Sequence, residues 1–434
     1  MKILRKILFI IGLLLILLLS LYTVYAKDIS YSMNKYDVEI FNYIEEGYNS
    51  ELKHDGYILG GSFLKEKIEK DEDTYDDYQV ILVKYDKDDK LVWKYTYGNT
   101  SEDYIYYLTY TYNEDGNIDG YLIVTKETYD VLEPNIGGNS VIIKIDFDGK
   151  LVYERKINEG VITKIIPTRD ENNIIDGYIS ILNTQAGSSL IKYNKDFEIV
   201  FRRDFNDTSL SDLALIKDDN KINGYVVICG KDLISLDLNG YSDVVIGDIS
   251  RYKTANLAES NNGFILYGVT TEVKLSKGNS SYYLINYKDN TLVWETIGDT
   301  AVTKNSAIKL LPIYKDDIVD EYFLLYENGI DSSYEVIKIN LDGEVLKKIK
   351  KINNSYYDFE NFYSTGSTIY FVGQINCPLD ENCEYDNNSL YLVSDEDKVI
   401  EVKDDTSKNI IIVFSIIFIL LVGGIIFIRR KTKR

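Results

Sequence analysis

The sequence predicts an all-β fold, a seven-bladed β-propeller of four-stranded blades, followed by one C-terminal transmembrane helix. Three observations predict it. Two alternating apolar segments around an Asp-, Asn- or Gly-rich turn occur seven times between residues 82 and 405. A shorter apolar segment with an aromatic residue near its start precedes each copy. An uninterrupted run of apolar and small residues, 410–428, closes the chain ahead of a basic tail.

The seven copies read as β-hairpins. They are residues 82–98, 141–157, 189–205, 232–248, 282–298, 334–350 and 389–405. Turns such as "DFDG" (146–149) supply the positive φ that tight hairpins need. Apolar and polar residues alternate with period two on both sides of each turn, which predicts strands rather than helices.

Two further strands precede each hairpin. The repeat can be followed through one aromatic residue per unit: Tyr57, Tyr121, Tyr178, Tyr225, Phe264, Tyr322 and Tyr370. These residues are 39 to 64 positions apart, and four strands at such a period are typical of a propeller blade. A single four-stranded sheet cannot bury both faces, so the blades must stack. The alternatives are a β-solenoid or a string of small β domains, but the chain has only four prolines for linkers.

The hairpins also carry a resemblance to a known class. Segments such as "IIKIDFDGKLVY" (142–153) and "LVKYDKDDKLVW" (82–93) resemble the repeats of bacterial secreted β-propellers of the kelch and quinoprotein-like kind. The resemblance extends over residues 38–405, and it implies a fold but no activity. Quinoprotein dehydrogenases need a cofactor-ligating set, and many carry an adjacent cysteine pair that is missing here. We therefore expect no organic cofactor.

Both ends of the chain predict a membrane topology. Residues 1–26 have a basic start, an apolar stretch and a small residue, Ala26, before Lys27, as in a secretory signal peptide. An uncleaved N-terminal anchor is the alternative. The 19 residues 410–428 can span a bilayer as a helix, and the basic residues of 429–434 stay cytoplasmic. The predicted order is signal peptide 1–26, extracellular propeller 27–405, linker 406–409, transmembrane helix 410–428 and tail 429–434.

The charge of the chain excludes some partners. It has 48 basic and 69 acidic residues; without the three basic residues of the leader and the five of the tail, 40 basic residues remain, a net charge of −29. Nucleic acid is not an expected partner, because phosphate contacts need clustered Lys and Arg. Basic partners and divalent cations suit the charge. Alternatively, the acidity only keeps a Tyr-rich β protein soluble and its edges unpaired.

Cysteine and histidine limit the chemistry. Cys377 and Cys383 flank a five-residue loop, and an extracellular compartment permits a disulfide between them. A zinc site and free thiols are the alternatives. His54 is the single histidine, so Ser-His-Asp or Cys-His catalysis would have to use it. A pair of carboxylates would suffice for glycoside hydrolysis, but with 69 acids the sequence nominates no pair.

The loops between the second and third strands of the first, second and seventh repeats are long: 63–78, 126–139 and 375–388. Ring closure makes these repeats neighbours, so we expect one acidic patch with interleaved tyrosines. Its residues are Asp73, Tyr75, Asp76, Asp77, Tyr78, Tyr129, Asp380, Glu381 and Asp386. Such a patch suits calcium, a basic partner or a calcium-bridged sugar. The alternative is three solvated loops that bind nothing.

The sequence therefore predicts a single-pass protein of the cell membrane with its N-terminal domain outside. Its propeller is expected to bind a protein, a glycan or a wall component close to the membrane. One alternative is an extracellular carbohydrate-active hydrolase or lyase that uses a carboxylate pair. The other is a scaffold subunit of a membrane complex. Whether any catalysis occurs, and which ligand is bound, does not follow from the residues.

Overall fold

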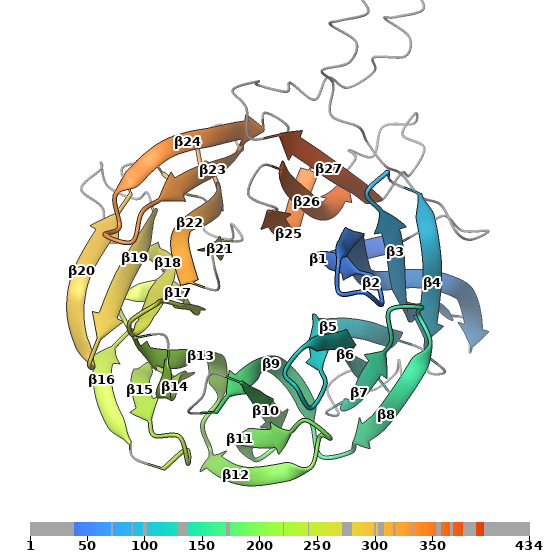
Figure 1. Ribbon diagram of the computed structural model, residues 1–434, viewed down its shortest axis with the longest axis horizontal. Helices are drawn as coiled ribbons and strands as arrows, with labels where there is room; N and C mark the ends of the chain where they lie inside the picture. The colour runs from blue at the N-terminus through green and yellow to red at the C-terminus, as the bar shows by residue number, and fades with distance from the viewer. Residues whose placement is uncertain are drawn as a thin grey trace, which may run out of the picture.

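The computed structural model is a ring of antiparallel β-sheets (Figure 1). It describes residues 39–394 apart from gaps at 71–72, 89, 99–101, 129–137, 171–173, 220, 242, 271–279, 299–300, 303–307, 316–317, 331–332, 353–356, 365–367 and 376–387. The predicted signal peptide, linker, transmembrane segment and tail lie outside these residues. Within the described ranges, no helix has the length and apolar character to cross a membrane.

The described strands form six hydrogen-bonded sheets. The first contains β1 (Glu39–Tyr48), β2 (His54–Lys70), β3 (Asp73–Asp86), β4 (Leu91–Tyr97), β5 (Glu102–Tyr112), β6 (Ile118–Thr128), β7 (Asn139–Ile145) and β8 (Leu151–Ile157). The second contains β9 (Val161–Arg169), β10 (Ile175–Thr184), β11 (Gly187–Asn194) and β12 (Ile199–Asn206). The third contains β13 (Leu210–Asp218), β14 (Lys221–Cys229), β15 (Asp232–Leu236) and β16 (Val244–Asp248).

The remaining three sheets complete the ring. The fourth contains β17 (Tyr252–Glu259), β18 (Phe264–Thr270), β19 (Ser281–Lys288) and β20 (Thr291–Ile297). The fifth contains β21 (Lys309–Lys315), β22 (Ile318–Glu327), β23 (Tyr334–Ile339) and β24 (Val345–Ile352). The sixth contains β25 (Tyr357–Ser364), β26 (Thr368–Ile375) and β27 (Asn388–Ser394).

The predicted number of seven separate blades is wrong: the strands that the structure describes form six sheets. The difference arises where the first two repeats meet. β3 and β5 are bridged in parallel at Tyr78 and Glu102, so β1–β8 form one continuous eight-stranded sheet. Within it, β1–β4 and β5–β8 each keep the antiparallel order of the other four-stranded sheets. The alternating pattern predicts the strands correctly. It does not predict the β3–β5 bridge, because a contact of one residue pair has no recognisable sequence pattern.

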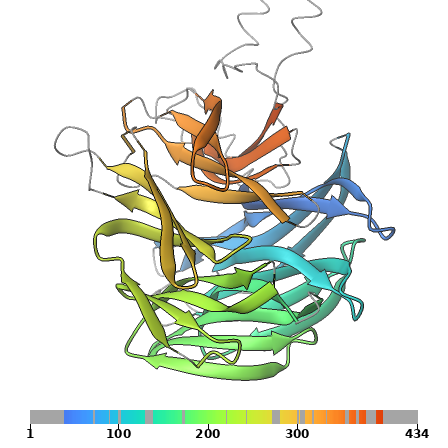
Figure 2. The same cartoon turned by 60° about the vertical axis from the view of Figure 1, so that its left-hand side comes forward.

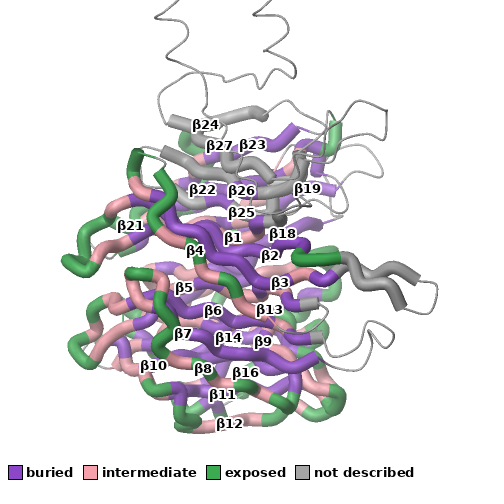
Figure 3. The backbone as a smooth tube through the Cα atoms, turned by 90° about the vertical axis from the view of Figure 1, so that its right-hand side faces the viewer, coloured by how far each residue is buried: buried purple, intermediate pink, exposed green. Residues whose placement is uncertain are grey.

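Successive sheets pack face to face around the ring (Figure 2). The first strand of each repeat lies nearest the centre and the last strand at the rim (Figure 1). The middle strands are buried, as β7 is along most of its length, whereas the rim strand β8 is largely exposed or half-buried (Figure 3). The ring closes through side chains, because Val372 of β26 joins the apolar cluster of Phe41 and Ile44 of β1.

The tight turns between third and fourth strands share one structure. In the turn after β7, Asp146 Oδ1 accepts hydrogen bonds from the backbone N–H groups of Asp148 at 2.9 Å and Lys150 at 2.8 Å. Gly149 in this turn has φ +79°, a conformation that glycine adopts without steric cost. A Cβ at Gly149 would also lie 2.6 Å from the Trp93 side chain of β4. Glycine is therefore required both by the turn and by the neighbouring rim strand.

A buried lysine on the third strand pairs with an acid at the start of the second. Lys84 lies 3.0 Å from Asp55, and Lys144 lies 2.6 Å from Asp119. The Lys84 side chain is 2% exposed, so it would be costly to bury without its acid. In the third sheet, Ser235 stands at the lysine position in the strand register. The residue at the acid position there is Asn223, which is also neutral. In these repeats, the lysine and its acid therefore form a matched pair: they are either both present or both replaced by neutral residues.

Candidate ligand-binding site

The structure describes five residues of the predicted acidic patch, all on β3: Asp73, Tyr75, Asp76, Asp77 and Tyr78. Tyr129, Asp380, Glu381 and Asp386 lie outside the described residues, as do Cys377 and Cys383. Convergence of the three long loops therefore stays a prediction. Among the residues that the structure describes, no group of three or more His, Cys, Asp or Glu side chains could hold a metal ion.

The first of the predicted loops, 63–78, is mostly strand. β2 runs as far as Lys70 and β3 begins at Asp73, and the two strands pair along their full length after a bulge near Leu64. The register places Lys67 opposite Asp76 and Lys70 opposite Asp73. The stretch is mostly charged and has no period-two apolar pattern, which is why the sequence predicts a loop there.

Two residues of the patch have described side chains. Asp77 is buried, 4% exposed, with one carboxylate oxygen 3.4 Å from Lys65 Nζ. Burial raises the pKa of Asp77, and Lys65 acts in the opposite direction. The Tyr78 ring stacks on Tyr104 with centroids 5.9 Å apart. Asp77 therefore points into the protein rather than outward as a surface acid.

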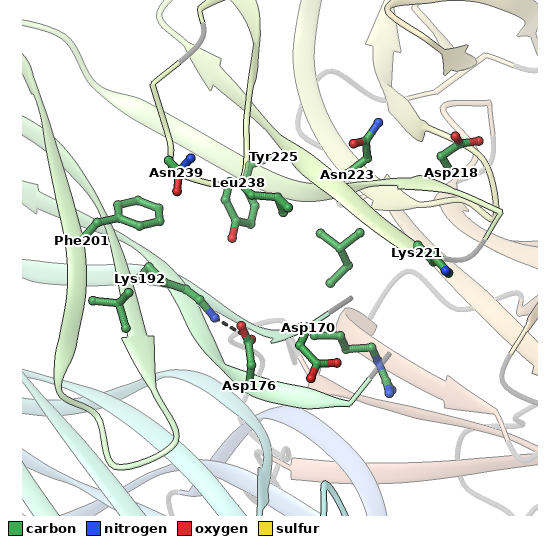
Figure 4. Close-up of a pocket in the computed structure, with 13 residues that line it drawn as sticks. Asp170, Asp176, Lys192, Phe201, Asp218, Lys221, Asn223, Tyr225, Leu238 and Asn239 are labelled. Atoms are coloured by element: carbon green, nitrogen blue, oxygen red, sulfur yellow. Dashed lines mark hydrogen bonds and ion pairs between the residues drawn. The ribbon is translucent and has the colours of Figure 1, made fainter. Parts of the chain in front are cut away.

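A different hollow, which the sequence did not suggest, lies between the β9–β12 and β13–β16 sheets (Figure 4). It has a volume of about 470 Å³, within the usual range of small-molecule sites. Its walls combine charged, amide, aromatic and aliphatic side chains. They are Arg169, Asp170, Asp176, Lys192, Val200, Phe201, Asp218, Lys221, Ile222, Asn223, Tyr225, Leu238 and Asn239.

The elements around the hollow explain its position. Arg169 and Asp218 are the last residues of β9 and β13, so the ends of both first strands border it. Leu238 stands in the β15–β16 turn at the position that Phe147 occupies in the β7–β8 turn. The Phe147 ring packs edge-on against Tyr121, with centroids 6.0 Å apart, whereas Leu238 is 47% exposed. A smaller side chain at this position leaves space between the sheets.

Tyr225 differs from the equivalent tyrosines of other repeats. The Tyr121 hydroxyl accepts a hydrogen bond from the Tyr48 backbone N–H at 2.9 Å, and the Tyr178 hydroxyl donates to the Tyr110 carbonyl at 3.5 Å. Tyr225 as a whole residue is 2% exposed, and its hydroxyl makes no hydrogen bond to any group that the structure describes. This oxygen is not one of the buried unpaired oxygens of the described residues, which agrees with its place in the lining of the hollow. In Figure 4 the hydroxyl points toward the side of the hollow where Lys192 and Asp176 lie.

The ionised groups of the hollow balance one another. Three are basic and three acidic, so the formal charge of its lining is zero in a strongly acidic chain. Lys192 is 2.6 Å from Asp176. Burial lowers the pKa of Lys192, and the Asp176 carboxylate opposes that shift. Asp170 Oδ1 accepts the backbone N–H of Ile174 at 2.9 Å.

Four polar side chains on the rim are available to a ligand. Across the described residues, the side chains of Asp218, Lys221, Asn223 and Asn239 make no hydrogen bond or ion pair with the protein. All four belong to exposed residues. The hollow therefore presents a carboxylate, an ammonium group and two amides, together with the Tyr225 hydroxyl. This set can donate and accept hydrogen bonds in several directions.

Comparisons with known proteins support the fold and nothing finer. No protein-family model matches the chain, and no curated protein sequence matches it. The Dos1 propeller is 10% identical with a TM-score of 0.50, and the match covers 88% of this chain and 97% of that one. The β-propeller domain of the Trilobed protease from Pyrococcus furiosus is 11% identical with a TM-score of 0.44, over 84% and 98% of the two chains. A protein from Lactobacillus plantarum is 11% identical with a TM-score of 0.46, over 74% and 89%. The ring of sheets and the match to the Dos1 propeller show that the chain is a β-propeller, as the repeats predicted.

Proposed function

We propose that this chain is a single-pass cell-surface protein whose propeller binds an extracellular ligand in the hollow between the β9–β12 and β13–β16 sheets. The observation that carries the proposal is the hollow itself. The Tyr225 hydroxyl and four exposed polar side chains, none of them bonded to a described group of the protein, line one concave site. Polar groups that converge on a cavity of this size are typical of small-molecule sites.

The surface location rests on both ends of the sequence. The signal-like residues 1–26 and the apolar segment 410–428 with its basic tail favour an external propeller. The described chain begins at Glu39, and β1 runs from there to the turn before His54. The ends of β9 and β13, which border the hollow, correspond to the end of β1. The hollow therefore opens on the face of the ring opposite the start of the described chain.

The state of the carboxylates favours binding over hydrolysis. Bond cleavage by a carboxylate pair needs one group as acid and the other as base or nucleophile. In the hollow, Asp176 is ion-paired with Lys192 and Asp170 is hydrogen-bonded to the Ile174 backbone. Asp218 is the remaining acid of the lining. We therefore favour a binding role for this site.

Cysteine labelling of intact cells tests the proposal. Leu238→Cys places a thiol at the exposed edge of the hollow, and we expect a membrane-impermeant maleimide to label it above the background of the unchanged protein. Thr432→Cys, in the predicted cytoplasmic tail, is the matched control and should react only after permeabilisation. Protection of Leu238→Cys in intact cells, with labelling after lysis, would overturn the surface location.

A further inference from the structure

We propose that the hollow takes a neutral saccharide, with the Tyr225 hydroxyl as a central hydrogen-bonding group. This inference rests on the proposed function and adds the chemical class of the ligand. It follows from three features of the lining: its charge balance, its mixture of donors and acceptors, and its aromatic surface.

Charge balance argues against a charged ligand. Arg169, Lys192 and Lys221 oppose Asp170, Asp176 and Asp218, so neither an anion nor a cation meets an excess of opposite charge. An anion would also approach against the field of a strongly acidic chain. A neutral ligand avoids both costs, and it leaves the Lys192–Asp176 ion pair intact.

The free groups suit a ligand with several hydroxyls. Asp218 can only accept hydrogen bonds when ionised, Lys221 can only donate, and the Asn223 amide can do both. The Tyr225 hydroxyl also does both. A saccharide carries neighbouring hydroxyl groups that each donate and accept, and so it can satisfy all of these side chains at once. An apolar ligand would displace water from these groups without replacing its hydrogen bonds, which is unfavourable.

An aromatic surface completes the site. Phe201, which is half-buried, provides this surface. The ring of Tyr225 packs beside it, with centroids 6.4 Å apart and planes tilted by 50°. The turn of the next sheet fixes the position of Phe201, because a Cβ on Gly240 would lie 2.8 Å from its ring. Rigid aromatic surfaces provide contact area for the apolar face of a ligand at low cost in conformational entropy. The C–H face of a sugar ring fits that surface, while its hydroxyls reach the rim.

The test uses the full chain in lipid nanodiscs, so that no sugar-headed detergent competes. The probes are maltose, cellobiose and N,N′-diacetylchitobiose, with glucuronic acid and glucosamine as charged counterparts. Ligand-observed NMR detects binding and titration calorimetry measures affinity. We expect at least one neutral probe to bind, and the charged probes to bind more weakly or not at all.

Three variants connect binding to the hollow. Tyr225→Phe removes only the free hydroxyl and should weaken affinity by about 2- to 10-fold. Leu238→Trp fills the opening and should abolish binding. Tyr178→Phe is the matched control, because its hydroxyl bonds to the protein and lies outside the hollow; affinity should not change.

The outcomes separate this inference from the proposed function. Unchanged affinity in Tyr225→Phe would overturn the role of the hydroxyl, and binding of none of the probes would overturn the saccharide class. Binding of the charged probes alone would overturn the choice of a neutral ligand. If Leu238→Trp still blocked those probes, the hollow would remain the ligand site. Failure of the proposed function has a separate readout, which is protection of Leu238→Cys in intact cells.

Discussion

The indole Nε1 of Trp93 donates a hydrogen bond to the backbone carbonyl of Phe147, 2.8 Å away. Trp93 lies on the rim strand of the first repeat, and Phe147 lies in the β7–β8 turn of the second. The same contact recurs between Trp294 and the Leu341 carbonyl at 3.0 Å. In both turns a glycine follows two residues later, and a Cβ on either glycine would lie 2.6 Å from the indole ring. The rim strand and the next turn are therefore fitted to each other.

Gly149→Ala is expected to destabilise the propeller by about 1–3 kcal/mol. The substitution strains a left-handed residue and pushes the new methyl group into Trp93. Trp93→Phe removes the hydrogen bond and should cost about 1 kcal/mol. Chemical unfolding measures both, with Val92→Thr as the control, because Val92 is 49% exposed and stays β-branched. Wild-type stability in Gly149→Ala would contradict the fitted contact.

Tyr121→Phe and Tyr225→Phe should differ in stability although both remove one hydroxyl from a buried ring. The Tyr121 hydroxyl satisfies the Tyr48 backbone N–H, so its loss should cost about 1 kcal/mol. The Tyr225 hydroxyl bonds to no described group, and its loss should leave the melting temperature unchanged without ligand. Equal destabilisation of the two variants, measured by differential scanning calorimetry, would show that Tyr225 has a structural partner.

Asp55→Asn should destabilise the protein more than the double variant Asp55→Asn/Lys84→Asn. The single change leaves the Lys84 ammonium group buried beside a neutral amide, and loss of one partner from a buried ion pair is costly. The double change reproduces the neutral pair of asparagines that the fourth sheet has at these two positions. Asn286 stands at the lysine position in the register of β18 and β19. Asn262 stands at the acid position, because it precedes Gly263 as Asp55 precedes Gly56. Urea unfolding of the two variants and of the unchanged protein measures their free energies of unfolding. A double variant less stable than Asp55→Asn would refute the matched-pair interpretation.

The strands could be predicted because their pattern is local. Each turn sequence and each alternating run depends on neighbouring residues, and six of the seven predicted hairpins are formed by the described strands; the second half of the seventh, after Ser394, lies outside the described residues. The β3–β5 bridge could not be predicted, because it depends on the spacing of two repeats in space. The outer part of the β2–β3 ribbon could not be predicted, because its mostly charged residues are typical of a loop.

The hollow could not be predicted because it depends on the absence of large or charged side chains at positions where another repeat has them. Leu238, Asn223 and Ser235 are ordinary residues, and none is a motif for binding. Comparison between repeats gives the signal: these three replace Phe147, Asp119 and Lys144 of the second repeat. An aligned set of repeats would have marked this boundary as different. It would not have shown that the Tyr225 hydroxyl is left without a partner.

Glu45 should make the stability of the propeller fall as pH rises. Glu45 lies on β1, and Tyr110 donates a hydrogen bond to it at 3.2 Å. Burial raises the pKa of Glu45 from 4.5 to about 8; the Tyr110 hydrogen bond acts in the opposite direction, and the neighbouring Glu46 adds to the rise. Between pH 4.5 and about pH 8, the folded protein binds more protons at Glu45 than the unfolded chain does. The contribution of Glu45 is therefore fully present below pH 4.5 and is lost as pH rises toward about 8.

Glu45→Gln tests this pH dependence. The amide keeps a polar group beside Tyr110 but cannot ionise, so the variant should gain stability relative to the unchanged protein as pH rises from 5 to 9. Below pH 4.5 the two proteins should be nearly equal, because Glu45 is then protonated in both the folded and the unfolded state. Melting temperatures across this range measure the difference, and Glu114→Gln, in the exposed turn after β5, is the control. A constant offset at every pH would show that Glu45 is not the titrating group.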